Sequence, residues 1–261
     1  MPRFKLTLEY AGTRYSGWQI QKNARTVQGE LDRAVRTVLK PRKYELYGSG
    51  RTDAGVHALA QVAHLDVATN LPPESLRRRL NDELPADINV LAIDVATHRF
   101  HARHSAESRS YVYQIARRRT AFGKALVWWV REPIDLVKMR EAATLFTGLQ
   151  DFQSFTDDDA EEKSTRVQVD PIEIAERGDL ILIRVSGSHF IWKMVRRIIG
   201  VLVAVGAGQL RMDDVREFLD SKSATPARLT APASGLFLER VYYEGDKQLK
   251  DLTPVLNLPS V

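Results

Sequence analysis

The stretch YGSGRTDAGVHALAQVAHLD, residues 47–66, places one carboxylate, Asp53, in a glycine-rich loop just before a strand-like run. Arg51 lies two residues earlier, and a neighbouring cation favours the ionised form of a carboxylate. An ionised carboxylate is a nucleophile or stabilises a developing charge. Asp and Gly are also ordinary turn formers, so a purely structural turn is the alternative. The following strand favours chemistry, because it holds Asp53 on a rigid element while the glycines let a ligand approach closely.

Two histidines and a second aspartate follow Asp53, which makes a metal site an alternative to consider. His57, His64 and Asp66 do not have the spacing of a strong ligand signature, and the chain has no cysteine. The sequence also lacks the G-x-S-x-G, P-loop and dinucleotide-binding motifs. We therefore predict no metal site. A metal-dependent hydrolase that uses Asp53, His57 and His64 stays as a competing hypothesis.

Aromatic residues lie among cations further along the chain. SRSYVYQIARRR (108–119) sets Tyr111 and Tyr113 on one face of a predicted strand. Proteins stack unpaired bases on such aromatics while cations hold the phosphates, although both tyrosines are equally compatible with the core. Arg196 falls off the apolar face of a predicted helix, and the pattern alone does not distinguish a functional arginine from a surface one.

Basic residues outnumber acidic ones. The chain of 261 residues has 38 Lys and Arg against 33 Asp and Glu, which gives a net charge of +5 and a pI near 9.4. A basic surface favours a polyanionic partner such as nucleic acid. The N-terminal strand pattern predicts no secretory signal, and no stretch reaches the length of a membrane-spanning helix. We expect a cytoplasmic protein without membrane contact.

The elements that position these residues follow the order β-α-β-β-α-β twice. The first half has predicted strands at 4–10, 44–47, 61–67 and 89–96, a helix capped by Thr26 and a helix over 72–84. The second half has predicted strands at 110–116, 166–176, 180–185 and 235–243, a helix capped by Asp135 and stopped by Gly148, a helix over 190–206 and a short helix at 213–220. The acidic run at 156–164 is predicted as a solvated loop.

This repeated order predicts an α+β protein with two ferredoxin-like, split βαβ halves. We place the N-terminal half, with the GRTDAG loop, at residues 1–103 and the C-terminal half at 104–261. The two halves are expected to join in one antiparallel-rich sheet with a central catalytic cleft.

Six segments in succession resemble the signatures of the tRNA pseudouridine synthase A family. They are YAGTRYSGWQIQKNARTVQGELDRAV, SGRTDAGVHALAQVAHLD, RFHARHSAESRSYVY, LQDFQSF, SHFIWKMVRRIIG and APASGLFL. The resemblance extends from about residue 6 to residue 242, and GRTDAGVHA is highly specific.

The resemblance implies an enzyme that isomerises uridine to pseudouridine at positions 38 to 40 of the tRNA anticodon stem-loop, as a homodimer without cofactor or metal. It implies that Asp53 is the nucleophile and that Tyr111 stacks on the target uracil. It also implies that Arg196 pairs with the carboxylate and that Arg51 contacts RNA near the flipped base. Arg197 stands where some members carry asparagine.

The sequence leaves the chemical route open. Asp53 attacks C1′ of the sugar, attacks C6 of the ring, or acts as a base on the sugar. A non-catalytic tRNA- or RNA-binding protein on the same platform is the runner-up, although the intact GRTDAG, Tyr111 and MVR residues favour the enzyme. Which tRNAs are modified is not encoded in any motif.

Overall fold

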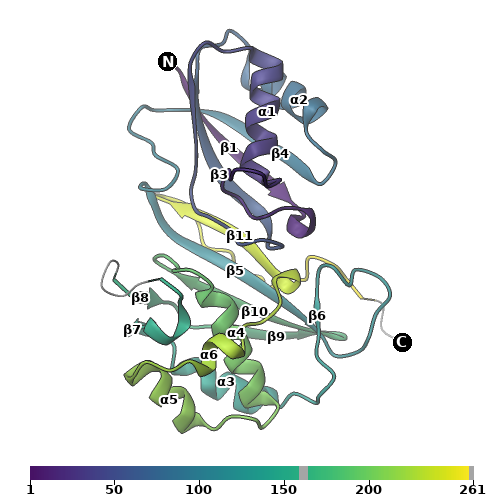
Figure 1. Ribbon diagram of the computed structural model, residues 1–261, viewed down its shortest axis with the longest axis vertical. Coiled ribbons are helices and arrows are strands. Elements are labelled where there is room, and N and C mark those ends of the chain that lie inside the picture. The colour runs from purple at the N-terminus through teal and green to yellow at the C-terminus, as the bar shows by residue number, and fades with distance from the viewer. Residues whose placement is uncertain (159–163, 259–261) are drawn as a thin grey trace. The chain divides into compact units, whose positions relative to one another are not determined.

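The computed structural model describes residues 1–158 and 164–258 (Figure 1). The chain forms two compact units, of which the first comprises Met1–Glu107 and Phe237–Lys247 and the second Ser108–Leu236 and Gln248–Val261. This division differs from the predicted one at residue 103, because a segment near the C-terminus belongs with the first unit. Residues 159–163 of the acidic run lie outside the described residues.

The first unit contains a mostly antiparallel sheet and two helices. Its elements are β1 (Arg3–Tyr10), α1 (Val27–Leu39), β2 (Tyr44–Gly48), β3 (His57–Val67), α2 (Pro73–Glu83), β4 (Ile88–Ala96) and β11 (Leu236–Tyr243). The antiparallel strands lie in the order β4-β1-β3-β2. Strand β11 pairs in parallel with the start of β3, where Phe237 lies opposite His57.

Local signals explain the elements of this unit. Alternate residues of β1 are fully buried, as a strand with one face on a core requires. Helix α1 begins where the Thr26 hydroxyl accepts a hydrogen bond from the Gly29 N–H at 3.2 Å, and it ends at Lys40 in the left-handed region. Helices α1 and α2 contact each other and lie on the same side of the sheet (Figure 1).

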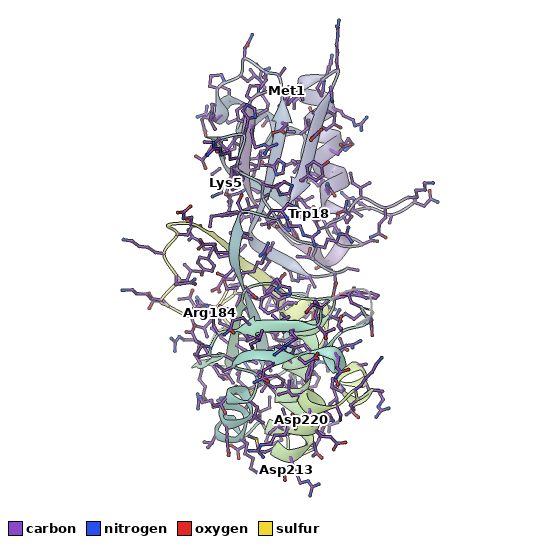
Figure 2. The ribbon with its side chains drawn as sticks, turned by 90° about the vertical axis from the view of Figure 1, so that its left-hand side faces the viewer. Met1, Lys5, Trp18, Arg184, Asp213 and Asp220 are labelled. Atoms are coloured by element: carbon purple, nitrogen blue, oxygen red, sulfur yellow. The ribbon has the colours of Figure 1, made fainter. Side chains whose placement is uncertain are left out.

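The second unit is also built from strands and helices. Its elements are β5 (Ala106–Ala116, which starts just before the unit boundary), β6 (Trp128–Trp129), α3 (Leu136–Thr144), β7 (Gly148–Asp151), β8 (Arg166–Val169), β9 (Glu173–Arg177), β10 (Leu180–Gly187), α4 (Met194–Gly206), α5 (Met212–Asp220) and α6 (Thr225–Arg228). Strand β10 pairs antiparallel with β5, β9 and β8, and β8 with β7. Figure 2 labels Arg184 on β10 and Asp213 and Asp220 at the two ends of α5.

Several boundaries in this unit differ from the predicted ones, among them the start of β5 at Ala106 instead of residue 110. The single strand expected over 166–176 is two strands, β8 and β9, because Pro171 has no N–H for a sheet ladder. The helix expected from residue 190 begins at Met194, since Lys193 has a φ of +62°. Ile191 therefore precedes the helix and is partly exposed. Helix α3 ends at Thr144, and Gly148 opens β7 instead.

Each unit is thus an α+β arrangement with a mostly antiparallel sheet, which confirms the predicted class. Helix α4 has the most apolar surroundings, with twelve of its thirteen residues buried. Within the described parts of the chain, none of the helices combines the length and the apolar character that crossing a lipid bilayer requires.

Candidate active-site residues in the two units

Asp53 opens a tight turn immediately before β3. The Val56 N–H donates to the Asp53 carbonyl oxygen at 3.1 Å, which closes a four-residue turn. Gly55 has a φ of +78° at the third position of this turn, where a type II turn requires glycine or asparagine. The Asp53 side chain is half-buried. We call residues 49–56 the Asp53 loop.

Buried polar contacts hold the backbone on the N-terminal side of Asp53. Thr52 is buried, with its hydroxyl 2.8 Å from the hydroxyl of Tyr10, and its carbonyl accepts the Trp18 N–H at 3.1 Å. The buried Gln61 side chain donates to the Gly50 carbonyl at 3.2 Å. Because both neighbours of Arg51 are held in this way, the exposed Arg51 side chain extends from a fixed backbone. The loop is positioned by the fold, as the sequence predicts.

A close approach of two backbones makes glycine necessary beside this loop. Gly17 has a φ of +92°, and a Cβ there would lie 2.5 Å from the Thr52 carbonyl oxygen. Gly12 is tighter still, since its Cβ would lie 1.9 Å from the carbonyl oxygen of Val56. The segment 12–17 therefore packs directly on the Asp53 loop. No local pattern in the sequence indicates this support.

The residues of the metal hypothesis have other partners. His57 accepts the Gly12 N–H through Nδ1 at 3.0 Å, and His64 accepts the Ala102 N–H through Nδ1 at 3.1 Å. Asp66 forms a two-point ion pair with Arg3, at 2.7 and 2.5 Å. In residues 1–158 and 164–258, no three His, Asp or Glu side chains converge in a way that suits a metal ion. These contacts favour a structural role for all three.

The buried His64 predicts a loss of stability in weak acid. Burial, with smaller contributions from Arg3 and His101, lowers the pKa of His64 from 6.5 to about 4. Since the folded-state pKa lies below the unfolded one, protonation favours the unfolded chain, and stability is lost as the pH falls from 6.5 towards 4. We expect His64 to lower the free energy of unfolding by at most about 2 kcal/mol between pH 7.5 and pH 5.

Urea unfolding of the wild type and of His64→Gln at both pH values measures this term. His189 lies in the second unit and acts equally in both proteins, whereas His101, whose ring is 4.6 Å from that of His64, is coupled to it, so the comparison measures His64 together with that coupling. The variant should therefore lose less stability than the wild type. An equal loss in the two proteins contradicts the assignment to His64.

The second unit separates the two tyrosines that share one face of β5. Tyr113 is fully buried, and its hydroxyl donates to the Pro232 carbonyl at 2.8 Å, so the core interpretation is correct for this residue. Tyr111 is only half-buried, and its ring meets the edge of Phe190 with 5.2 Å between centroids at 90°. Of the two tyrosines, therefore, only Tyr111 has exposed surface that a ligand could contact.

Arg196 lies on α4, next to the segment that contacts Tyr113. Its Nε–H donates to the Ala231 carbonyl at 2.7 Å, and the Ala231 N–H returns a bond to the Arg196 carbonyl at 3.0 Å. Burial raises the pKa of Tyr113 well above its usual value, and the charge of Arg196 acts in the opposite direction. The two bonds tie α4 to the segment at Ala231 and hold Nε of Arg196 at the Ala231 carbonyl.

Arg197 has a role that the sequence argument missed. Its side chain is buried and donates to the carbonyls of Thr156, at 2.7 Å, and Ser154, at 3.3 Å. It also forms an ion pair with Asp157, which in turn contacts Lys193 at 2.7 Å. These bonds fasten the segment after β7 to the start of α4. A charged residue inside an apolar helix is the signal that points to such a buried partner.

The packing around Arg196 depends on a glycine one turn later. A Cβ at Gly200 would lie 1.7 Å from the carbonyl oxygen of Leu229 and 3.3 Å from the Ala231 nitrogen. The backbone of residues 229–231 therefore lies directly against α4, which lets the Ala231 carbonyl reach Arg196.

The predicted site residues are divided between the two units. Asp53 and Arg51 belong to the first unit, and Tyr111 and Arg196 belong to the second.

The chain is similar to known proteins of one family. A family model described as tRNA pseudouridine synthase matches residues 7–105 and 142–244. The tRNA pseudouridine synthase A of Nitrobacter winogradskyi is 41% identical over 96% of this chain and 99% of its own length. That of Limosilactobacillus reuteri is 39% identical over 96% of this chain and all of its own length.

A solved structure is also similar, but weakly. The archaeal box H/ACA sRNP Nop10-Cbf5 complex aligns with 87% of this chain and 58% of its own chain, at 14% identity and a TM-score of 0.37. The assignment depends instead on the family model, whose matched ranges contain Asp53 and Arg196, and on the near full-length relatives. On this evidence, the chain belongs to the tRNA pseudouridine synthase A family.

Proposed function

We propose that the protein isomerises uridine to pseudouridine at positions 38, 39 and 40 of the tRNA anticodon stem-loop, with Asp53 as its nucleophile. The family supplies the reaction class. The observation that supports Asp53 is its place in a turn that β3, Gln61 and Thr52 hold from both sides. The fixed backbone of this loop holds the half-buried Asp53 in one place, which supports a role as a nucleophile.

The reaction needs no redox partner. The N1–C1′ bond breaks, a C5–C1′ bond forms, C5 loses a proton and N1 gains one. Atoms and electrons therefore balance within the nucleotide, and an ionised carboxylate that adds and leaves again is sufficient. Attack at C1′, attack at C6 and proton abstraction from the sugar are all open to Asp53.

The remaining residues are proposed either to bind the tRNA or to keep Asp53 ionised. Tyr111 is proposed to stack on the everted uracil, which offsets the few kcal/mol that unstacking costs. Arg196, whose Nε–H donates to the Ala231 carbonyl, is proposed to keep the carboxylate of Asp53 ionised. Arg51, exposed beside Asp53, is proposed to contact the phosphates. The net charge of +5 favours the tRNA electrostatically.

Substitution of Tyr111 tests the stacking role. We expect Tyr111→Phe to keep most of the turnover, since the ring and its edge contact with Phe190 remain. Tyr111→Ala should lower kcat/KM roughly 10- to 100-fold, the cost of one base–aromatic stack. Tritium release from tRNA carrying C5-labelled uridine measures both. Equal losses in the two variants would instead assign the role to the hydroxyl.

The function itself is tested on one tRNA transcript. Mass spectrometry after treatment with a pseudouridine-selective reagent should find the modification at positions 38 to 40, with activity unchanged by a chelator. Binding without any pseudouridine would favour the non-catalytic RNA-binding alternative. Loss of activity with the chelator would favour the metal-dependent hydrolase.

Assembly and location are part of the same proposal. We propose a homodimer in the cytoplasm, where tRNA is present, without membrane contact. Sedimentation equilibrium gives the mass directly, and the mass of a single chain at micromolar concentration would contradict the dimer.

A further inference from the structure

The first unit has a cavity next to the Asp53 loop that the proposed chemistry does not use. Its volume is about 570 Å³, within the range of small-ligand pockets. It is lined by β2 and by Trp18, which Figure 2 labels, and by His101, Arg103 and His104. Gly50 and Arg51 of the Asp53 loop complete the lining. We call this cavity the Tyr47 groove.

A tyrosine with rings behind it forms part of the lining. Tyr47 is 49% exposed, although it lies on a regular strand. Its ring stacks on His64, with 5.3 Å between centroids and 25° between planes, and lies 5.8 Å from the ring of His101. His101 in turn contacts His104 at 4.3 Å. An aromatic face that is fixed from behind and open in front suits a flat, unpaired base.

Cations line the same groove on a rigid segment. Arg103 and His104 are exposed. The backbone of residues 102–104, however, is held by hydrogen bonds. The His101 ring accepts the N–H groups of Arg103, at 3.1 Å, and His104, at 3.3 Å, through Nδ1. The buried Ala102, which lies between His101 and Arg103, donates its N–H to His64. Arg51 and Arg103 together outweigh the single negative charge that Glu45 adds to the lining.

The groove is next to the proposed nucleophile along the chain. Arg51 lines it, and Asp53 is two residues further on, which places their Cα atoms at most about 7 Å apart. A nucleotide in the groove and a uridine at Asp53 are therefore close enough to belong to one continuous strand. Stacking and phosphate contacts that do not change during the reaction contribute binding energy without accelerating the chemical step.

We propose that the Tyr47 groove binds an unpaired nucleotide that adjoins the target uridine, with the base stacked on Tyr47 and the phosphate held by Arg51 and Arg103. This subsite rests on the proposed function, because it fixes the register of the tRNA strand at Asp53. It makes the groove a determinant of which uridine enters the active site.

Steady-state kinetics of Tyr47→Ala, Tyr47→Phe and Arg103→Gln on one tRNA test the subsite. Tyr47→Ala should raise KM roughly 10- to 100-fold, the loss of one stack, with kcat within threefold of the wild type. Tyr47→Phe should stay close to the wild type. Arg103→Gln should reduce the salt dependence of binding by about one counterion. The matched controls Phe122→Ala, another exposed aromatic, and Arg42→Gln, another exposed arginine, should change neither constant.

The outcomes separate the groove from the reaction. An unchanged KM in Tyr47→Ala, with an active wild type, overturns the subsite and leaves the proposed function in place. A wild type that makes no pseudouridine overturns the proposed function first. A spectroscopic readout is independent of turnover: 2-aminopurine next to the target should lose fluorescence on binding to Asp53→Asn, but not to Asp53→Asn with Tyr47→Ala. Equal quenching by both proteins also overturns the subsite.

Discussion

Asp53→Asn should lower turnover by at least about a thousandfold, as loss of a catalytic nucleophile does in other enzymes. The amide has nearly the shape of the carboxylate but is neither a nucleophile nor a base, so all three chemical routes are lost together. The turn itself should persist, because it is closed by the backbone of Asp53 and Val56 and by the φ of Gly55. Tritium release from C5-labelled tRNA gives the rate.

Binding of tRNA, in contrast, should change little. Removing a negative charge near a polyanion does not weaken the complex electrostatically, so the Kd for tRNA should stay within about threefold of the wild-type value. Asp94→Asn, an exposed aspartate on β4, is the matched control and should leave both quantities unchanged. Residual turnover above a few per cent in Asp53→Asn would refute the assignment, as would a loss of activity explained entirely by weaker binding.

Gly200→Ala should destabilise the protein by about 1–3 kcal/mol, although alanine is usually the better residue inside a helix. The reason is the Leu229 carbonyl, which would lie 1.7 Å from the new methyl group. Either α4 or residues 229–231 must move, and the segment carries the carbonyl that holds Arg196. A second effect on turnover is therefore expected at temperatures where the variant is still folded.

The measurement pairs thermal unfolding with kcat. A loss of that size lowers Tm by about 2–12 °C for a chain of this length. Gly29→Ala in α1 is the matched control, because its methyl group would meet two side chains, the Thr26 hydroxyl at 2.9 Å and Ile20 at 4.0 Å, and no backbone carbonyl. It should change stability by less than about 1 kcal/mol. A Gly200→Ala variant as stable and active as the wild type would contradict the tight contact.

The sequence predicts most of the helices and strands, because their signals are local. Thr26 and Asp135 cap the helices that they are predicted to cap, through bonds to residues two or three positions away. The start of α4 is not predictable in this way. Lys193 adopts the left-handed region, which lysine rarely does, and nothing in the apolar spacing of 190–206 reveals it.

The candidate site shows the same limit. The glycines, Asp53 and Arg51 are recognisable because they are adjacent in the sequence. The supports of the loop, Tyr10, Trp18 and Gln61, come from separate elements and are brought together only by the sheet. Tyr47 looks like an ordinary strand residue until its exposure and its contact with His64 are known. Contacts between distant segments carry no local signal.

Strand β11 has a consequence for how the protein is made. Residues 237–247 complete the first unit, where Phe237 stacks on His57 at 4.7 Å and the Tyr243 hydroxyl donates to the Ala102 carbonyl at 2.7 Å. At 5–20 residues per second, a ribosome reaches residue 237 only after roughly 10–50 s. Until then His57, the first residue of β3, and the Ala102 carbonyl cannot form these two contacts. The first unit, although it contains the N-terminal residues, can therefore complete its folding only after this late segment has been synthesised.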